Sequence, residues 1–133
     1  MFEVTVSGRF RASHQLRRAN GECEPLHAHD WQVRVTYVGP RLSAAGWLID
    51  FGVVREHLLG VLSVLESANL NEVPALRGLP PSAETIALYV AEKLPAAPDS
   101  GVRLAAVEVE EEPGCVARYC PAESRSALPG RHA

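Results

Sequence analysis

Hydrophobic and polar residues alternate along two stretches near the N-terminus. In residues 2–14 the apolar side carries Phe2, Val4, Val6, Phe10, Ala12 and His14. Alternation resumes with His27, His29, Trp31, Val33, Val35 and Tyr37 on one side and stops at Gly39-Pro40. A period of two is typical of half-buried strands, and Asn20-Gly21 and Pro25 predict a loop over 15–26. We therefore expect an antiparallel hairpin.

Two helices are predicted in the middle of the chain. The first covers about 52–66, with Asp50 as a suitable N-cap. Its apolar stripe at helical spacing consists of Val54, Leu58, Val61, Leu62 and Leu65. The second helix begins after Ser82, which is also a suitable N-cap, has Glu84 in its first turn and ends before Pro95.

Alternation returns over residues 103–112, and Pro113-Gly114 predicts a turn into a last strand at 115–120. One side carries Arg103, Ala105, Val107, Val109 and Glu111, and the other carries Leu104, Ala106, Glu108 and Glu110. The order ββ–α–α–ββ predicts an α+β fold, with one four-stranded antiparallel sheet and two helices on one face. We expect a single domain over residues 1–121 and a flexible tail over 122–133.

The composition is that of an ordinary globular domain, with 133 residues, 47% hydrophobic and 22% charged. The formal net charge of -3 gives no reason to expect nucleic acid or an anionic membrane as a partner. There is no run of eighteen apolar residues, and Glu3 and Arg9 interrupt any signal-like segment. A cytoplasmic location is therefore the expectation.

Three cysteines without C-x-x-C spacing make a disulfide framework unexpected. Cys115 and Cys120 lie in or beside an apolar stretch, so we expect them to be buried, inert thiols. Cys23 differs because it lies in the polar loop, four residues before His27.

The three histidines of the hairpin point to a metal site. In an antiparallel pairing, His14 at the end of the first strand meets His27 and His29 at the start of the second, on the same face. Imidazoles suit zinc, and three of them leave a coordination position open, as in catalytic sites. Two alternatives remain at this stage. The histidines are unrelated polar residues around a loop, or Cys23 is a fourth ligand of a structural site.

Glu111 stands out from the acidic run at 108–112, whose other members read as a solvated face. Its position in the alternation places it with Val107 and Val109 on the apolar face, where a carboxylate needs a partner or a ligand. An N–H-rich heterocycle is one such ligand.

In order along the chain, these segments resemble the 6-pyruvoyltetrahydropterin synthase and 6-carboxytetrahydropterin synthase family. Phe10-Arg11-Ala12-Ser13-His14 is similar to the family's F-x-A-x-H, and Cys23-x-x-x-His27-Ala28-His29 to its C-x-x-x-H-G-H. Further matches are Gly46-Trp47-Leu48-Ile49-Asp50-Phe51 to G-x-x-x-D-F, Leu70-Asn71 to LN, and Pro81-Ser82-Ala83-Glu84 to P-T-x-E. The match spans about residues 2–120.

The resemblance implies a tunnelling (T-) fold and a zinc-dependent lyase that acts on 7,8-dihydroneopterin triphosphate or a close analogue. It assigns the zinc to His14, His27 and His29, proton transfer to the Cys23 thiolate, and the pterin to Glu111. It also implies trimers that close into a barrel, often stacked as hexamers, with sites between subunits. Two open sheet edges would favour such a homo-oligomer.

The sequence departs from the family at its Asp-His pair, which acts from a neighbouring subunit. Glu66 and Ser67 occupy the matching positions, so a carboxylate is retained but the imidazole is lost. Serine cannot replace histidine as a proton carrier near pH 7. Ala28 also replaces a glycine, which a strand should tolerate.

That departure leaves two functions open, an enzyme that works without the histidine and a pterin- and zinc-binding homologue that has lost turnover. His57 on the first helix is a weak candidate for the missing imidazole. Arg17 and Arg18 in the loop are candidates for triphosphate binding.

Overall fold

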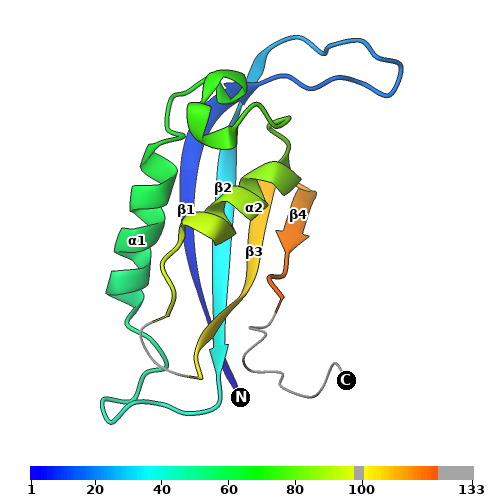
Figure 1. The fold of residues 1–133 in the computed structure, drawn as a ribbon. Coiled ribbons are helices and arrows are strands. Elements are labelled where there is room, and N and C mark those ends of the chain that lie inside the picture. Colours follow the sequence, from blue (N-terminus) through cyan, green and yellow to red (C-terminus); the bar gives the residue numbers. More distant parts are fainter. Residues whose placement is uncertain (98–100, 123–133) are drawn as a thin grey trace.

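The computed structural model describes residues 1–97 and 101–122. Strands β1 (Phe2–His14) and β2 (His27–Gly39) are followed by helices α1 (Phe51–Ser63) and α2 (Ala83–Lys93), then by strands β3 (Arg103–Glu112) and β4 (Cys115–Tyr119). Short 3₁₀ turns η1 (Leu70–Glu72) and η2 (Pro74–Leu76) lie between the helices. The strands form one antiparallel sheet in the order β1-β2-β3-β4, and both helices cover the same face (Figure 1). This confirms the predicted fold. The predicted tail beyond Ala122 lies outside the described residues.

The core lies between the sheet and the two helices. α1 packs on β1, and α2 packs on β3 and β4. Between them lies β2, one of the two inner strands of the sheet. Its inward-facing side chains Trp31, Val33 and Val35 are fully buried. They meet Leu58 and Leu62 of α1 and Ile86 and Val90 of α2 within one apolar cluster. The alternation of β2 therefore builds the face on which the histidines also lie.

Helix α1 begins as predicted but ends earlier. The Asp50 side chain accepts a hydrogen bond from the Gly52 N–H at 2.8 Å, which confirms the predicted cap. The helix ends at Ser63 rather than near 66, because the following residues turn back toward β1. The Ser67 N–H donates to the Arg11 carbonyl at 2.7 Å, and the Ser13 N–H donates to the Ala68 carbonyl at 2.9 Å. These bonds with β1 replace helical ones.

The alternation predicted for 103–112 is wrong in its first half. Thr36 pairs with Ala106, but the next residue, Tyr37, pairs with Leu104, so Ala105 is left in a bulge. A bulge shifts the strand by one residue and exchanges its two faces. Leu104 consequently packs against the core instead of facing away from it.

The expectation that Cys115 and Cys120 are buried is also wrong, because both are exposed, as is Cys23. Cys115 begins β4, an edge strand whose side chains are mostly exposed. A short edge strand has few apolar neighbours to pack against. The apolar residues near Cys115 and Cys120 in the sequence therefore did not mean that these thiols are buried.

No helix in the described part of the chain is long and apolar enough to cross a membrane. The cytoplasmic location stays a prediction.

Two adjacent leucines of α1 test the position of the core. Leu58 has 0% of its surface exposed and Leu59 has 50%. Leu58→Ala is expected to lower the free energy of unfolding by about 2–5 kcal/mol, since it leaves a cavity in the core. Leu59→Ala is the matched control and should change it by less than about 1 kcal/mol. Chemical denaturation of both variants measures this, and equal losses would contradict the packing of α1.

Candidate metal centre

The hairpin brings the three predicted histidines together. His14 pairs with His27, and Ala12 pairs with His29, so all three side chains lie at one end of β1 and β2. One ring nitrogen from each lies within 4.8 Å of those from the other two. The rings meet edge to face, with centroids 4.7–5.2 Å apart. This is the clustering expected of a three-histidine metal site.

Two backbone carbonyls fix which nitrogen of the His14 and His27 rings is free to bind. His14 Nδ1 lies 2.8 Å from the Pro81 carbonyl oxygen, and His27 Nδ1 lies 2.8 Å from the Pro25 carbonyl oxygen. Because a carbonyl only accepts, each Nδ1 carries the proton and each Nε2 keeps its lone pair. Carbonyls in this position commonly orient metal-binding histidines and set their tautomer.

The Nε2 atoms of His14 and His29 are buried and have no hydrogen-bond partner. Leaving such atoms unpaired costs free energy, and the cost is removed when a cation binds their lone pairs. Burial lowers the pKa of His29, with the nearby Glu111 carboxylate acting in the opposite direction. The neutral imidazole that burial favours is the form that binds metal. The residues therefore fit a divalent metal such as zinc.

Trp31 forms the floor beneath the histidines. Its indole lies 4.9 Å from His14 and 5.7 Å from His29, measured between ring centroids, and it also stacks on Phe10. The indole Nε1 donates to the Ala12 carbonyl at 3.2 Å. The Trp31 indole is fully buried, and the imidazoles of His14 and His29 contact it edge to face.

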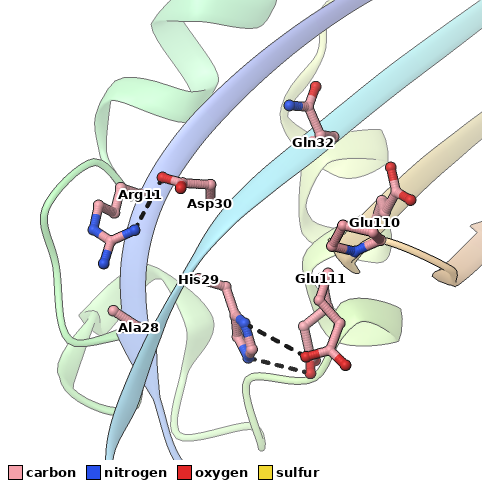
Figure 2. A pocket seen from close by; sticks show the side chains of 9 residues that line it. Arg11, Ala28, His29, Asp30, Gln32, Glu110 and Glu111 are labelled. Atoms are coloured by element: carbon pink, nitrogen blue, oxygen red, sulfur yellow. Dashed lines mark ion pairs between the residues drawn. The ribbon is translucent and has the colours of Figure 1, made fainter.

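Glu111 lies next to the histidines, as its position in the strand predicts. One carboxylate oxygen is 3.4 Å from His29 Nε2 and the other is 3.9 Å from His14 Nε2. The β2–β3 ladder ends at Gln32 and Glu110, and the strands part just beyond it. Figure 2 shows His29 facing Glu111 across this opening.

A cavity of about 530 Å³ occupies the opening between β2 and β3. Its wall includes Glu110, Arg11 and Asp30, and the last two form an ion pair at 3.1 Å (Figure 2). Glu112 also lines this cavity. A second cavity of about 250 Å³ lies on the other side of Glu111, against Glu84 and Cys115. Glu111 thus borders two spaces, each open to a ligand.

Cys23 lies in a different place from the metal cluster. It is exposed and lines a cavity of about 290 Å³ together with Arg17, Asn71 and Pro81. Among the described residues, the clusters of potential metal ligands do not include Cys23, which argues against a closed four-ligand site. Pro81 joins this cavity to the metal cluster, since its carbonyl holds His14.

Asn71 holds the start of the loop that carries Cys23. Its side chain accepts from the Gln15 N–H at 2.9 Å and donates to the Gln15 carbonyl at 3.0 Å. The Leu70-Asn71 match therefore has a structural role in this chain. In the same loop, Gln15 also donates to the Glu24 carbonyl at 3.0 Å.

The remaining candidates do not join the histidines within the described chain. Glu66 is exposed beside β1, where its carboxylate accepts from the Arg11 N–H at 3.4 Å and from the Ser67 hydroxyl at 3.2 Å. His57 is exposed on α1 and belongs to neither potential metal cluster of the described residues. Arg17 and Arg18 are in the loop, and the Arg17 guanidinium donates to the Gly21 carbonyl at 2.7 Å.

A protein-family model described as 6-pyruvoyl tetrahydropterin synthase matches residues 3–122. The chain belongs to this family. A 6-carboxy-5,6,7,8-tetrahydropterin synthase from Synechocystis sp. is 36% identical over 115 residues, which cover 83% of this chain and 86% of the relative. A protein from Halobacterium salinarum, described as a probable enzyme of the same name, is 26% identical over 82% of this chain and 80% of its own.

Solved structures of the family share the fold. The Caenorhabditis elegans 6-pyruvoyl tetrahydropterin synthase superimposes with a TM-score of 0.77 at 20% identity, covering 91% of this chain and 96% of that one. The Plasmodium vivax enzyme gives 0.68 at 22% identity, covering 89% and 96%. These likenesses confirm the predicted T-fold.

Sequence reasoning missed three neighbours of the histidines. Glu112 brings a second carboxylate within 3.9 Å of His29 Nδ1. Pro25 and Pro81 supply the orienting carbonyls, and the backbone of any residue would offer the same group. Only Glu112 left a signal, as an acidic neighbour of Glu111. The Pro81 contact spans 67 residues and has no local signature.

Proposed function

We propose that this protein is a zinc-dependent lyase that removes triphosphate from 7,8-dihydroneopterin triphosphate or a close analogue. The observation that carries the proposal is the set of three imidazoles with two buried, unpartnered Nε2 atoms directly beside the Glu111 carboxylate. A metal at the histidines and a heterocycle at Glu111 would lie side by side, as the two ends of one pterin ligand require. Family membership and the carboxypterin synthase relative support the same class of substrate.

Each residue has a role that suits its chemistry. His14, His27 and His29 would hold the zinc, which when bound supplies Lewis acidity toward hydroxyl groups of the substrate side chain. Glu111 would accept hydrogen bonds from the pterin N–H edge. The Cys23 thiolate would take a proton from the substrate side chain, after which the carbon–oxygen bond to triphosphate breaks and the leaving group keeps the electron pair.

We further propose that the active form is a homo-oligomer, with a trimer as its unit. β1 and β4 are the two edges of the sheet, and they expose Phe2, Val116 and Tyr119. Glu66 lies along the β1 edge rather than at the histidines of its own subunit. Pairing of these edges between copies would bring Glu66 to a neighbour's site, where a carboxylate could assist Cys23.

The direct experiment is a turnover assay on zinc-loaded protein with 7,8-dihydroneopterin triphosphate, with triphosphate release as the readout. Release above that of a Cys23→Ala control is expected. If the two proteins release triphosphate equally slowly, the lyase proposal is wrong for this substrate.

The second candidate is a pterin- and zinc-binding protein without turnover, and Ser67 is the observation that favours it. Within the described part of the chain, the Ser67 hydroxyl bonds only to the neighbouring Glu66 carboxylate, and it offers no group that titrates near pH 7. This candidate predicts that pterin binds, that Glu111→Ala weakens binding, and that turnover is absent.

Ser67→His separates the two candidates. Residue 67 has φ of 62°, a left-handed conformation that histidine adopts more readily than most residues, so the variant should fold. If the missing imidazole limits turnover, the rate of triphosphate release should rise roughly tenfold or more. Ser63→His, at an exposed serine of α1, is the matched control and should not change it. An active wild type that Ser67→His leaves unaffected would rule out the binder.

A further inference from the structure

Glu111 has an unusual environment for a half-buried carboxylate. Its side chain is 25% exposed, and no hydrogen bond to its oxygens is found among the described residues. Its nearest polar atoms are the Nε2 atoms of His29 and His14, at 3.4 and 3.9 Å. Neither contact is a hydrogen bond, since both nitrogens are without a hydrogen-bond partner. Three groups that can donate an electron pair thus face one another without a hydrogen bond between them.

The spacing of these atoms matches ligands around one ion. Zinc bonds to nitrogen and oxygen of about 2.0–2.2 Å at tetrahedral angles put neighbouring ligand atoms roughly 3.3–3.6 Å apart. The distance from Glu111 to His29 Nε2, 3.4 Å, lies in this range. His14, whose side chain is fully buried, directs its unpartnered Nε2 at the same carboxylate. A cation between them would satisfy all three groups.

We infer that Glu111 is the fourth ligand of the metal in the ligand-free protein, completing a site of three nitrogens and one oxygen. This goes beyond pterin binding by Glu111 and rests on the metal centre of the proposed function. The same carboxylate then has two alternative partners, the metal and the N–H edge of a heterocycle. A ligand that binds to both Glu111 and the metal must break the bond between Glu111 and the metal on entering.

Glu112 is the natural control because it is adjacent but oriented differently. Its carboxylate lies 3.9 Å from His29 Nδ1, the ring nitrogen on the other side from Nε2, and its side chain is 53% exposed. Among the described residues, Glu112 belongs to a second potential metal cluster with His29 and Glu111, but not to the cluster of His14, His27 and His29. Glu111→Gln and Glu112→Gln remove the same charge from neighbouring residues, and a metal on the three histidines should respond only to Glu111→Gln.

The test uses full-length protein loaded with Co²⁺, whose visible d–d absorption reports the number and type of ligands. Competition with a chelator measures its affinity. Glu111→Gln should change the position and intensity of the d–d bands and weaken Co²⁺ binding by roughly tenfold or more. Glu112→Gln should keep the wild-type spectrum and stay within about threefold in affinity. Thermal unfolding of the metal-free variants checks that both are folded.

The failure of this inference can be told from failure of the proposed function. If the Glu111→Gln protein binds Co²⁺ with the wild-type spectrum and affinity, the fourth ligand is not Glu111, while the three-histidine site stands. If wild-type protein binds no Co²⁺, or His14→Ala binds it equally well, the metal centre itself is wrong and the inference falls with it.

Discussion

His29→Ala is expected to abolish zinc binding without destabilising the metal-free protein. His29 Nε2 is a buried nitrogen with no hydrogen bond, so removing this unsatisfied group offsets the loss of the ring's edge-to-face contacts with His14, His27 and Trp31. The free energy of unfolding of the metal-free variant should therefore stay within about 1 kcal/mol of wild type. The same change removes one of three nitrogens that face a common point, which should lower zinc affinity by several orders of magnitude.

Thermal unfolding with and without zinc measures both effects. Zinc at about 1,000 times its dissociation constant should stabilise the wild type by about 4 kcal/mol, and the variant by close to nothing. His57→Ala, which removes an exposed histidine from α1, is the control and should respond to zinc as wild type does. A His29→Ala protein that retains one zinc per chain, determined by elemental analysis after dialysis, would contradict the three-histidine centre.

Cys23→Ala is expected to lower the rate of triphosphate release by at least about 100-fold, the usual effect of losing a positioned acid or base. Zinc content should not change, because Cys23 lines a different cavity from the one beside the histidines. Alanine keeps the loop bonds that Gln15 and Asn71 make, so the substitution acts on the chemistry alone.

Cys120→Ala is the matched control, since it removes an exposed thiol outside the proposed machinery. This variant should retain turnover within about threefold of wild type. If Cys23→Ala loses zinc in parallel with activity, Cys23 is a metal ligand and the structural-site alternative is right. If it loses neither, the thiol has no part in the reaction.

The fold followed from the sequence where the signal was local. Alternation over 2–14 and 27–38 gave the hairpin, and its register followed because both strands have one apolar face. Asp50 and Ser82 marked the starts of both helices, since each caps an N–H two or three residues ahead. These features depend on neighbours a few residues away, and the sequence shows such neighbours directly.

The errors arose where distant contacts overrode a local pattern. α1 ends at Ser63 because residues 66–68 bond to β1, 55 residues earlier in the chain. The bulge at Ala105 is set by the pairing of β3 with β2, and no residue type marks it. Cys115 and Cys120 have apolar neighbours in sequence, but they belong to an edge that the helices do not cover.

The sequence by itself determined the fold class, the family resemblance and the convergence of His14, His27 and His29. Strand periodicity and antiparallel pairing are enough to place three side chains at one end of one face. Only the tertiary structure decided how those side chains are held and what surrounds them. Pro81 orients His14 across 67 residues of chain, and the pairing of β3 with β2 brings Glu111 within 3.4 Å of His29. The first contact requires the segment before α2 to pack on the sheet, and the second requires two strands far apart in the chain to pair.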